Sequence, residues 1–121
     1  MFGPVRRRFL QGENILAADY IAAWQKLEQL RASYAAAASE FDAVLLPSCP
    51  IEPPKASDLQ DDEDLFTSKN LMALQNTRIG NLMGLAALTV PTGVPSCGIM
   101  LQGPNEEHLL SLGAAIEKLL N

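Results

Sequence analysis

The sequence predicts an α/β protein with a small mixed sheet of about three strands covered by helices, in a single domain over residues 1–121. Two observations predict this fold class. Short apolar runs bounded by proline or glycine, at 43–46, 87–90 and 98–103, are typical of buried strands. Longer segments around them carry apolar residues every three or four positions, which indicates helices. No internal repeat or long linker divides the chain.

The composition fits one folded domain and excludes some classes of function. Hydrophobic residues make up 48% and charged residues 19% of the 121 positions, an ordinary globular balance. The net charge of -5 argues against a nucleic-acid-binding surface. No apolar run approaches the roughly 20 residues that span a bilayer. The run Arg6–Arg8 is followed by Glu13 and Asp19 rather than by an apolar export signal, so we expect a cytoplasmic protein with no membrane partner.

The residues that bind metals most often are too sparse here to predict a metal or cofactor. Cys49 and Cys97 lack the spacing of a zinc site, and His108 is the single histidine. The acidic run at 58–64 has neither the ligand spacing nor the central glycine of a calcium loop. We therefore expect a solvated acidic loop and two reduced thiols.

The first forty residues predict a short helix and a long one. Pro4 suits the start and Gly12 the end of the first, and Asn14 is a candidate N-cap for the second. For Tyr20 and Trp24, packing in a core is favoured over an aromatic ligand box. The apolar positions of the long helix are spaced by three and four residues: Leu16, Tyr20, Ala23, Trp24, Leu27, Leu30, Tyr34, Ala37, Ala38 and Phe41.

The second half predicts strands alternating with helices. Residues 43–46 are apolar on both faces, which suits the middle of a sheet. Thr67 or Ser68 is a candidate cap for the next helix, and Gly84 suits the left-handed residue after its end. The strands at 87–90 and 98–103 are joined by a short loop rich in proline and glycine, which predicts a hairpin.

The last helix has a cap and an apolar stripe that can be identified from the sequence. Asn105 is the expected N-cap, and the two glutamates that follow it suit the positive end of the helix dipole. The apolar stripe is Leu109, Leu112, Ile116 and Leu119.

Five motifs in this order resemble the C-terminal part of amidase signature enzymes. Residues 5–12 (VRRRFLQG) resemble the arginine-containing helix of that family, and residues 17–23 (AADYIAA) resemble the start of its next helix. Residues 41–50 (FDAVLLPSCP) resemble its strand ending in proline. Residues 81–103 and the final helix follow in the right order. The chain departs from the family at Ala86, Ser48 and Cys97, where proline, threonine and proline are usual; these changes affect local loop shape.

The resemblance implies the C-terminal segment of an enzyme like an amidase or the A chain of an amidotransferase, with no activity alone. Members of the family hydrolyse or transfer amides with a Ser–cis-Ser–Lys triad, whose nucleophile lies in a Gly/Ser-rich stretch upstream of the matched region. This chain has no such stretch, its serines are scattered, and no Ser-x-x-Lys spacing occurs. We therefore expect no catalytic residues here. The alternative is a non-catalytic structural or interaction module, and either interpretation makes a homo-oligomer or a complementary amidase chain the expected partner.

The strand ends give the candidate site. Ligands of open α/β sheets gather beyond the carboxyl ends of the strands. If the strands at 43–46 and 87–90 run parallel, Cys49 and Cys97 lie on one rim of the sheet, and Ser48, Cys49 and Thr92 are the candidate wall of a substrate pocket. The loops are not expected to bring the cysteines within the roughly 7 Å that a disulfide requires. A hydrolase using either cysteine with His108 is the least favoured interpretation, because no contact between them is indicated.

Overall fold

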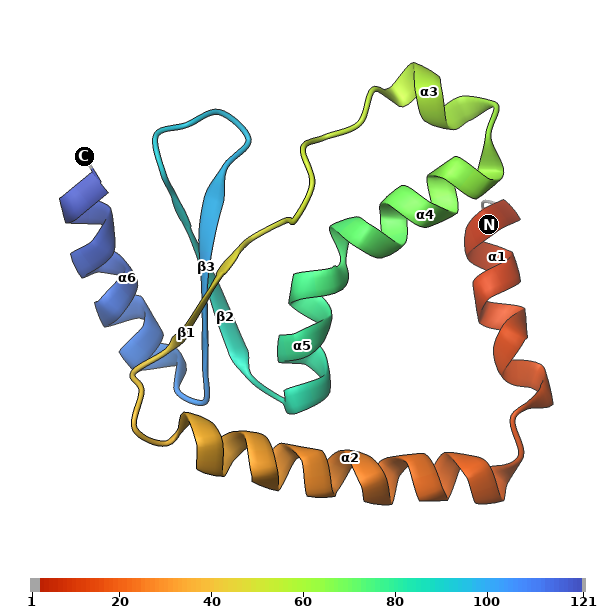
Figure 1. The fold of residues 1–121 in the computed structure, drawn as a ribbon, viewed down its shortest axis with the longest axis horizontal. Helices are drawn as coiled ribbons and strands as arrows, with labels where there is room; N and C mark the ends of the chain where they lie inside the picture. Colours follow the sequence, from red (N-terminus) through yellow and green to blue (C-terminus); the bar gives the residue numbers. More distant parts are fainter. Residues whose placement is uncertain (1–2, 121) are drawn as a thin grey trace.

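A computed structural model describes residues 3–120 and confirms the α/β fold class. The helices are α1 (Gly3–Leu10), α2 (Ala17–Ala38), α3 (Ala56–Gln60), α4 (Glu63–Ala73), α5 (Gln75–Met83) and α6 (Glu106–Leu120), with a 3-10 helix η1 at Gln11–Asn14. The strands are β1 (Val44–Pro47), β2 (Ala86–Pro91) and β3 (Gly98–Gly103). The sheet lies between α6 on one side and α5 on the other, and α2 runs along its base (Figure 1).

The sheet has the order β1-β3-β2, and both pairings are antiparallel. Leu101 in the central strand lies opposite Leu45 in β1 and Leu88 in β2. Two expectations were therefore wrong: the sheet is not mixed, and β1 lies at an edge rather than in the middle. The reason is that β3 forms a hairpin with β2 and pairs with β1 along its other edge. Pro47 and Pro91 both lie on edge strands, where a missing N–H is tolerated.

The hydrophobic core lies between α6 and one face of the sheet. Val90, Leu101 and Leu109 form its buried cluster, with exposed fractions of 4%, 0% and 1%. Leu112 and Ile116 of the expected helix stripe pack against this cluster, but Leu119 does not, because 85% of it is exposed. The fourth position on the packed face is instead Gly113, which is buried.

The opposite face of the sheet is contacted by α5. Gly80 of this helix lies against the Gln102 side chain, since a Cβ at Gly80 would be 3.1 Å from Gln102 Nε2. Asn76, also on α5, donates from Nδ2 to the Pro47 carbonyl at 2.7 Å. The helix is thus attached to the central strand and to one edge strand.

Two of the expected helix ends are confirmed. The Asn105 side chain accepts a hydrogen bond from the His108 backbone N–H at 2.9 Å, which caps α6. Gly84 has φ +72°, the left-handed conformation that commonly ends a helix.

The caps expected for two other helices were wrong. Asn14 lies in the 3-10 helix, and α2 begins after Leu16 with no side-chain cap. The helix expected to start at Thr67 or Ser68 starts earlier, because the Asp62 carboxylate accepts from Leu65 N–H at 2.8 Å and nucleates α4 at that point. The expectation of a loop at 58–64 was also wrong, because these residues form the end of α3, the cap of α4 and its first turn.

The long helix α2 is the largest departure from expectation. None of its residues is buried, and Tyr20 and Trp24, expected in a core, are 58% and 43% exposed. The helices α1, α3 and α4 also lie away from the sheet (Figure 1). Arg7 of the basic run forms an ion pair with Glu63, which joins α1 to α4. None of the helices over residues 3–120 has the length and apolar character needed to cross a membrane.

Candidate functional site

The two cysteines lie at the same end of the sheet. Both β1 and β2 are antiparallel to β3, so they point in the same direction. Their last residues, Pro47 and Pro91, lie opposite Ile99 and Gly98 at the start of β3. Cys49 follows the first of these ends, and Cys97 directly precedes Gly98. The expected shared rim is therefore present, although it arises from two strands separated by a third.

A hydrogen bond between hydroxyls crosses this rim. Ser48 Oγ donates to Thr89 Oγ1 at 3.1 Å, which joins the two edge strands over the central one. The contact is possible because Gly98 lies beneath it: a Cβ there would be 2.9 Å from both Ser48 Oγ and Thr89 Cγ2. The Ser48 backbone N–H also donates to Gly98 O at 2.9 Å. The position of Ser48 on the rim is thus fixed by backbone and side chain together.

The other two candidate wall residues have local partners. Cys49 Sγ lies 3.6 Å from the Ala73 carbonyl at the end of α4. Thr92 Oγ1 donates to the Cys97 carbonyl at 3.0 Å and accepts from Val94 N–H at 3.3 Å, which closes the hairpin loop. The fold brings all three candidate residues to one end of the sheet. Their role as a pocket wall stays a prediction.

We expect both thiols to remain reduced. Cys49 and Cys97 are exposed and unpaired with each other, and Cys49 is directed to the Ala73 carbonyl. Titration of unreduced, denatured protein with a thiol reagent should therefore give about two thiols per chain, the cysteine count of the sequence. The same titration after reduction gives the reference value. Fewer than one thiol before reduction would show that the cysteines are oxidised in the purified protein.

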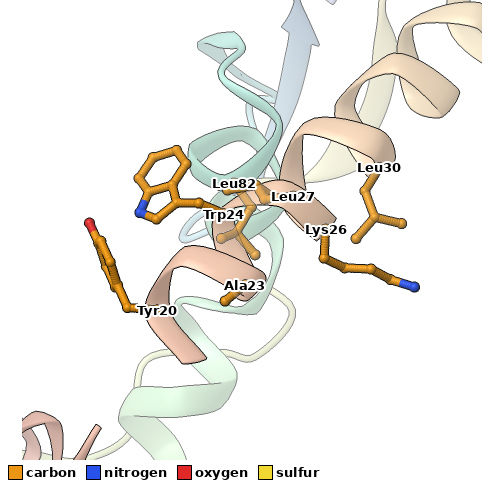
Figure 2. Close-up of a pocket in the computed structure, with 7 residues that line it drawn as sticks. All are labelled: Tyr20, Ala23, Trp24, Lys26, Leu27, Leu30 and Leu82. Atoms are coloured by element: carbon orange, nitrogen blue, oxygen red, sulfur yellow. The ribbon is translucent and has the colours of Figure 1, made fainter. Parts of the chain in front are cut away.

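An open apolar pocket of about 430 Å³ lies between α2 and α5. Figure 2 shows Tyr20 and Trp24 beside each other on α2, with the Lys26 ammonium directed away from them. The two aromatic rings meet edge to face, with centroids 6.3 Å apart. The residues that line the pocket are Tyr20, Ala23, Trp24, Lys26, Leu27, Leu30 and Leu82. The apolar periodicity of α2 predicted this face, whereas the contribution of Leu82 depends on how α5 packs.

Arg31 fixes α2 against α5 beside this pocket. Its Nε donates to the Leu82 carbonyl at 2.8 Å, and its guanidinium lies 5.5 Å from the centre of the Trp24 ring. The carbonyl belongs to the last turn of α5, where helix carbonyls lack intrahelical partners. The Arg31 side chain thus provides the hydrogen-bond donor for a carbonyl at the end of α5. Its cation–π contact with Trp24 also supports the wall of the pocket.

His108 has a partner that sequence analysis missed. Its Nε2 lies 3.1 Å from Asp42 Oδ1, and both side chains are at least half exposed. Asp42 precedes β1, so this pair lies at the end of the sheet opposite to Cys49 and Cys97. The topology therefore separates the histidine from both cysteines and gives no support to a cysteine–histidine hydrolase. No local signal could have paired residues 66 positions apart.

Five of the seven serines make hydrogen bonds to nearby helix carbonyls or to other side chains. Ser33, Ser39 and Ser111 donate to helix carbonyls three or four residues earlier. Ser57 donates to its neighbour Asp58, and Ser48 to Thr89. Over residues 3–120 the hydrogen bonds join no serine to a lysine, and no group of three or more His, Cys, Asp or Glu side chains could hold a metal ion.

Comparison with known proteins gives one family. The family model described as Amidase matches residues 2–110. The chain is 31% identical over 122 residues to 2-amino-5-chloromuconic acid deaminase of Comamonas testosteroni, covering 96% of this chain and 26% of that protein. It is 32% identical to the A chain of the glutamyl-tRNA(Gln) amidotransferase of Sulfurisphaera tokodaii, with 97% of this chain and 26% of that protein covered. No solved structure gives a significant match.

The family match and the fold agree. The matched residues extend from α1 to the start of α6 and include all three strands. The chain spans about a quarter of the length of these curated relatives. Because the family model covers far more than half of the sequence, the chain belongs to the amidase family.

Proposed function

We propose that this chain is the C-terminal segment of an amidase-like enzyme, in which it supplies sheet strands and one wall of the substrate pocket. The reaction of the complete protein would be hydrolysis of an amide C–N bond by a Ser–cis-Ser–Lys triad. The triad would come from the part of the amidase that this chain does not span, so the chain alone would be inactive. Ser48, Cys49 and Thr92 would face the substrate from the rim of the sheet.

The accessible surface of the chain is the observation that carries this proposal. It amounts to 9049 Å². A compact monomer of 13.1 kDa is expected to expose about 6,400 Å². The excess of about 2,650 Å² on this one chain is large even beside the roughly 2,000–5,000 Å² that obligate interfaces bury on both partners together. A chain with this much excess surface is better described as part of a larger assembly than as a complete globular unit.

The chemistry of the exposed surface agrees with a permanent interface. Apolar side chains that a folded monomer would bury are exposed on α1, α2 and the segment between them. They are Phe9 (74%), Leu10 (50%), Ile15 (60%), Leu16 (67%), Tyr20 (58%), Ile21 (56%), Trp24 (43%) and Leu30 (47%). An exposed apolar surface of this extent is typical of interaction sites. We propose that this surface packs on the rest of an amidase, in a complex located in the cytoplasm.

Without that partner, the purified chain is expected to self-associate. Besides its apolar surface, it has two edge strands, β1 and β2, whose outer hydrogen-bonding groups can pair with another chain. Light scattering across a concentration series should give masses above the 13.1 kDa of one chain at tens of micromolar. A constant monomer mass over that range would contradict the expectation.

The proposal is tested by adding the missing part of the enzyme. The chain is assayed with glutamine and simple amides in three forms: alone, co-expressed with a polypeptide from the adjacent reading frame that carries a Gly/Ser-rich triad region, and co-expressed with that polypeptide after its triad serine is replaced by alanine. Turnover is expected in the second form only.

Two outcomes would overturn the proposal. Turnover by the chain alone that rises in proportion to its concentration and survives further purification would place catalytic residues in this sequence. The absence of any adjacent triad-encoding reading frame would favour the non-catalytic interaction module instead.

A further inference from the structure

Gln102 is a buried polar residue in the central strand. Only 1% of it is exposed, and its neighbour Leu101 is fully buried. Its Nε2 donates to the Asn76 carbonyl of α5 at 3.1 Å and lies 3.6 Å from Met100 Sδ. These contacts fix the orientation of the amide, because the flipped amide would place two oxygen acceptors against each other. The Gln102 Oε1 atom is therefore the acceptor of this amide that is left without a partner, and it lies beside Gly80, where a Cβ would be 3.6 Å from it.

Two buried oxygens remain without a hydrogen-bond partner among residues 3–120. They are Gln102 Oε1, which can only accept, and Tyr34 Oη, which can donate and accept. They come from β3 and from the last turns of α2, 68 positions apart in the sequence. A buried polar atom that lacks a partner is destabilising, and in native proteins such atoms are commonly satisfied by ordered water.

Both residues line the same small cavity, of about 20 Å³. The cavity lies where the end of α2, the segment before β1 and the end of β3 meet, and its wall includes Asp42, Leu85 and Pro104. A buried water requires roughly 10–15 Å³ of such volume and two to four polar partners. The cavity has room for one water molecule and is too small for a larger ligand.

We infer that one structural water molecule binds in this cavity and bridges Tyr34 and Gln102. The water oxygen accepts a hydrogen bond from the Tyr34 hydroxyl, and the water donates a hydrogen bond to Gln102 Oε1. Each of the two buried oxygens then has a hydrogen-bond partner. Gln102 then links two helices to β3. Its Nε2 donates to the Asn76 carbonyl of α5, and its Oε1 accepts from the water that also binds Tyr34 of α2. Asn76 in turn donates to Pro47 O of β1 at 2.7 Å.

This hydration site positions the long helix on the sheet. Apart from Arg31, which donates to the Leu82 carbonyl of α5, few groups of the described chain hold α2 in place, since none of its residues is buried. Leu27, Leu30 and Tyr34 are spaced by three and four residues, so they lie on one face of the helix. A bond that fixes Tyr34 against β3 therefore also fixes the rotation of α2 that presents Leu27 and Leu30 to the apolar pocket.

A crystal structure of the 121-residue chain that resolves ordered waters tests the site directly. We expect a density peak between the two side chains, within about 2.6–3.2 Å of both Tyr34 Oη and Gln102 Oε1. A cavity with no density, or a direct hydrogen bond from Tyr34 to Gln102, would overturn the inference.

Stability and water contacts in solution give an independent test with a matched control. Tyr34→Phe removes the buried hydroxyl and is expected to lower Tm by about 3–6 °C, whereas Tyr20→Phe removes an exposed hydroxyl and should leave Tm unchanged. In the parent chain and in Tyr20→Phe, the side-chain amide protons of Gln102 should show nuclear Overhauser contacts to a slowly exchanging water, and these should be lost in Tyr34→Phe. Equal Tm values for the two variants, or water contacts that persist in Tyr34→Phe, would contradict the bridge.

Discussion

Replacing Leu109 with alanine is expected to lower the free energy of unfolding by about 2–5 kcal/mol, the range found when a large apolar side chain is removed from a packed core. Leu109 is 1% exposed and packs with Val90 and Leu101 in the small cluster that holds α6 on the sheet. The helix cannot move inward to fill the space, because Gly113 of α6 already lies against Leu88 of β2, where a Cβ would be 2.3 Å from Leu88 Cδ2. Denaturant unfolding followed by circular dichroism measures the loss.

Leu110 provides the matched control for this change. It is the next residue on the same helix and is 61% exposed, so Leu110→Ala deletes the same atoms without opening a cavity. Its effect should stay within about 0.5 kcal/mol. Because self-association would stabilise the folded state, both variants must be compared at one protein concentration. Equal losses for the two variants would mean that α6 does not pack through Leu109.

A valine at position 113 is expected to destabilise the chain by about 1–3 kcal/mol, because it overfills a closely packed contact. Gly113 is buried on the face of α6 that meets β2. A Cβ at this position would be 2.3 Å from Leu88 Cδ2 and 3.5 Å from Val90 Cγ2, so Leu88 must move or the helix must be displaced from the sheet. Thermal unfolding followed by circular dichroism would show the effect as a lower Tm.

Ala115→Val controls for the cost of a β-branched residue in this helix. Ala115 is exposed and lies two positions further along α6. The intrinsic helix preference of valine is weaker than that of alanine by less than about 1 kcal/mol, so the control should lose little stability. If Gly113→Val were as stable as this control, the close approach of α6 to Leu88 would be refuted.

The candidate rim could be predicted in part because the strand ends are marked by local signals. Prolines end both β1 and β2, so the residues that follow them had to lie beyond the sheet. The pocket beside α2 was predicted only as an apolar face, with Tyr20 and Trp24 expected in a core. The apolar spacing of a helix shows that the face requires a partner, but it does not show whether the same chain supplies it.

The sequence by itself determined the family, the three strands, the helices α1, α2 and α6, and those helix ends that depend on a single residue. It did not show α3 or the break between α4 and α5. Gly84 ends α5 because this one residue adopts a positive φ angle. Asn105 caps α6 because its side chain reaches the backbone N–H of His108. The tertiary structure alone decided the strand order β1-β3-β2, the pairing of His108 with Asp42, and the cavity shared by Tyr34 and Gln102. Each of these joins segments far apart in the chain. Local periodicity and capping carry no information about such contacts, because they depend on how whole helices and strands pack against one another.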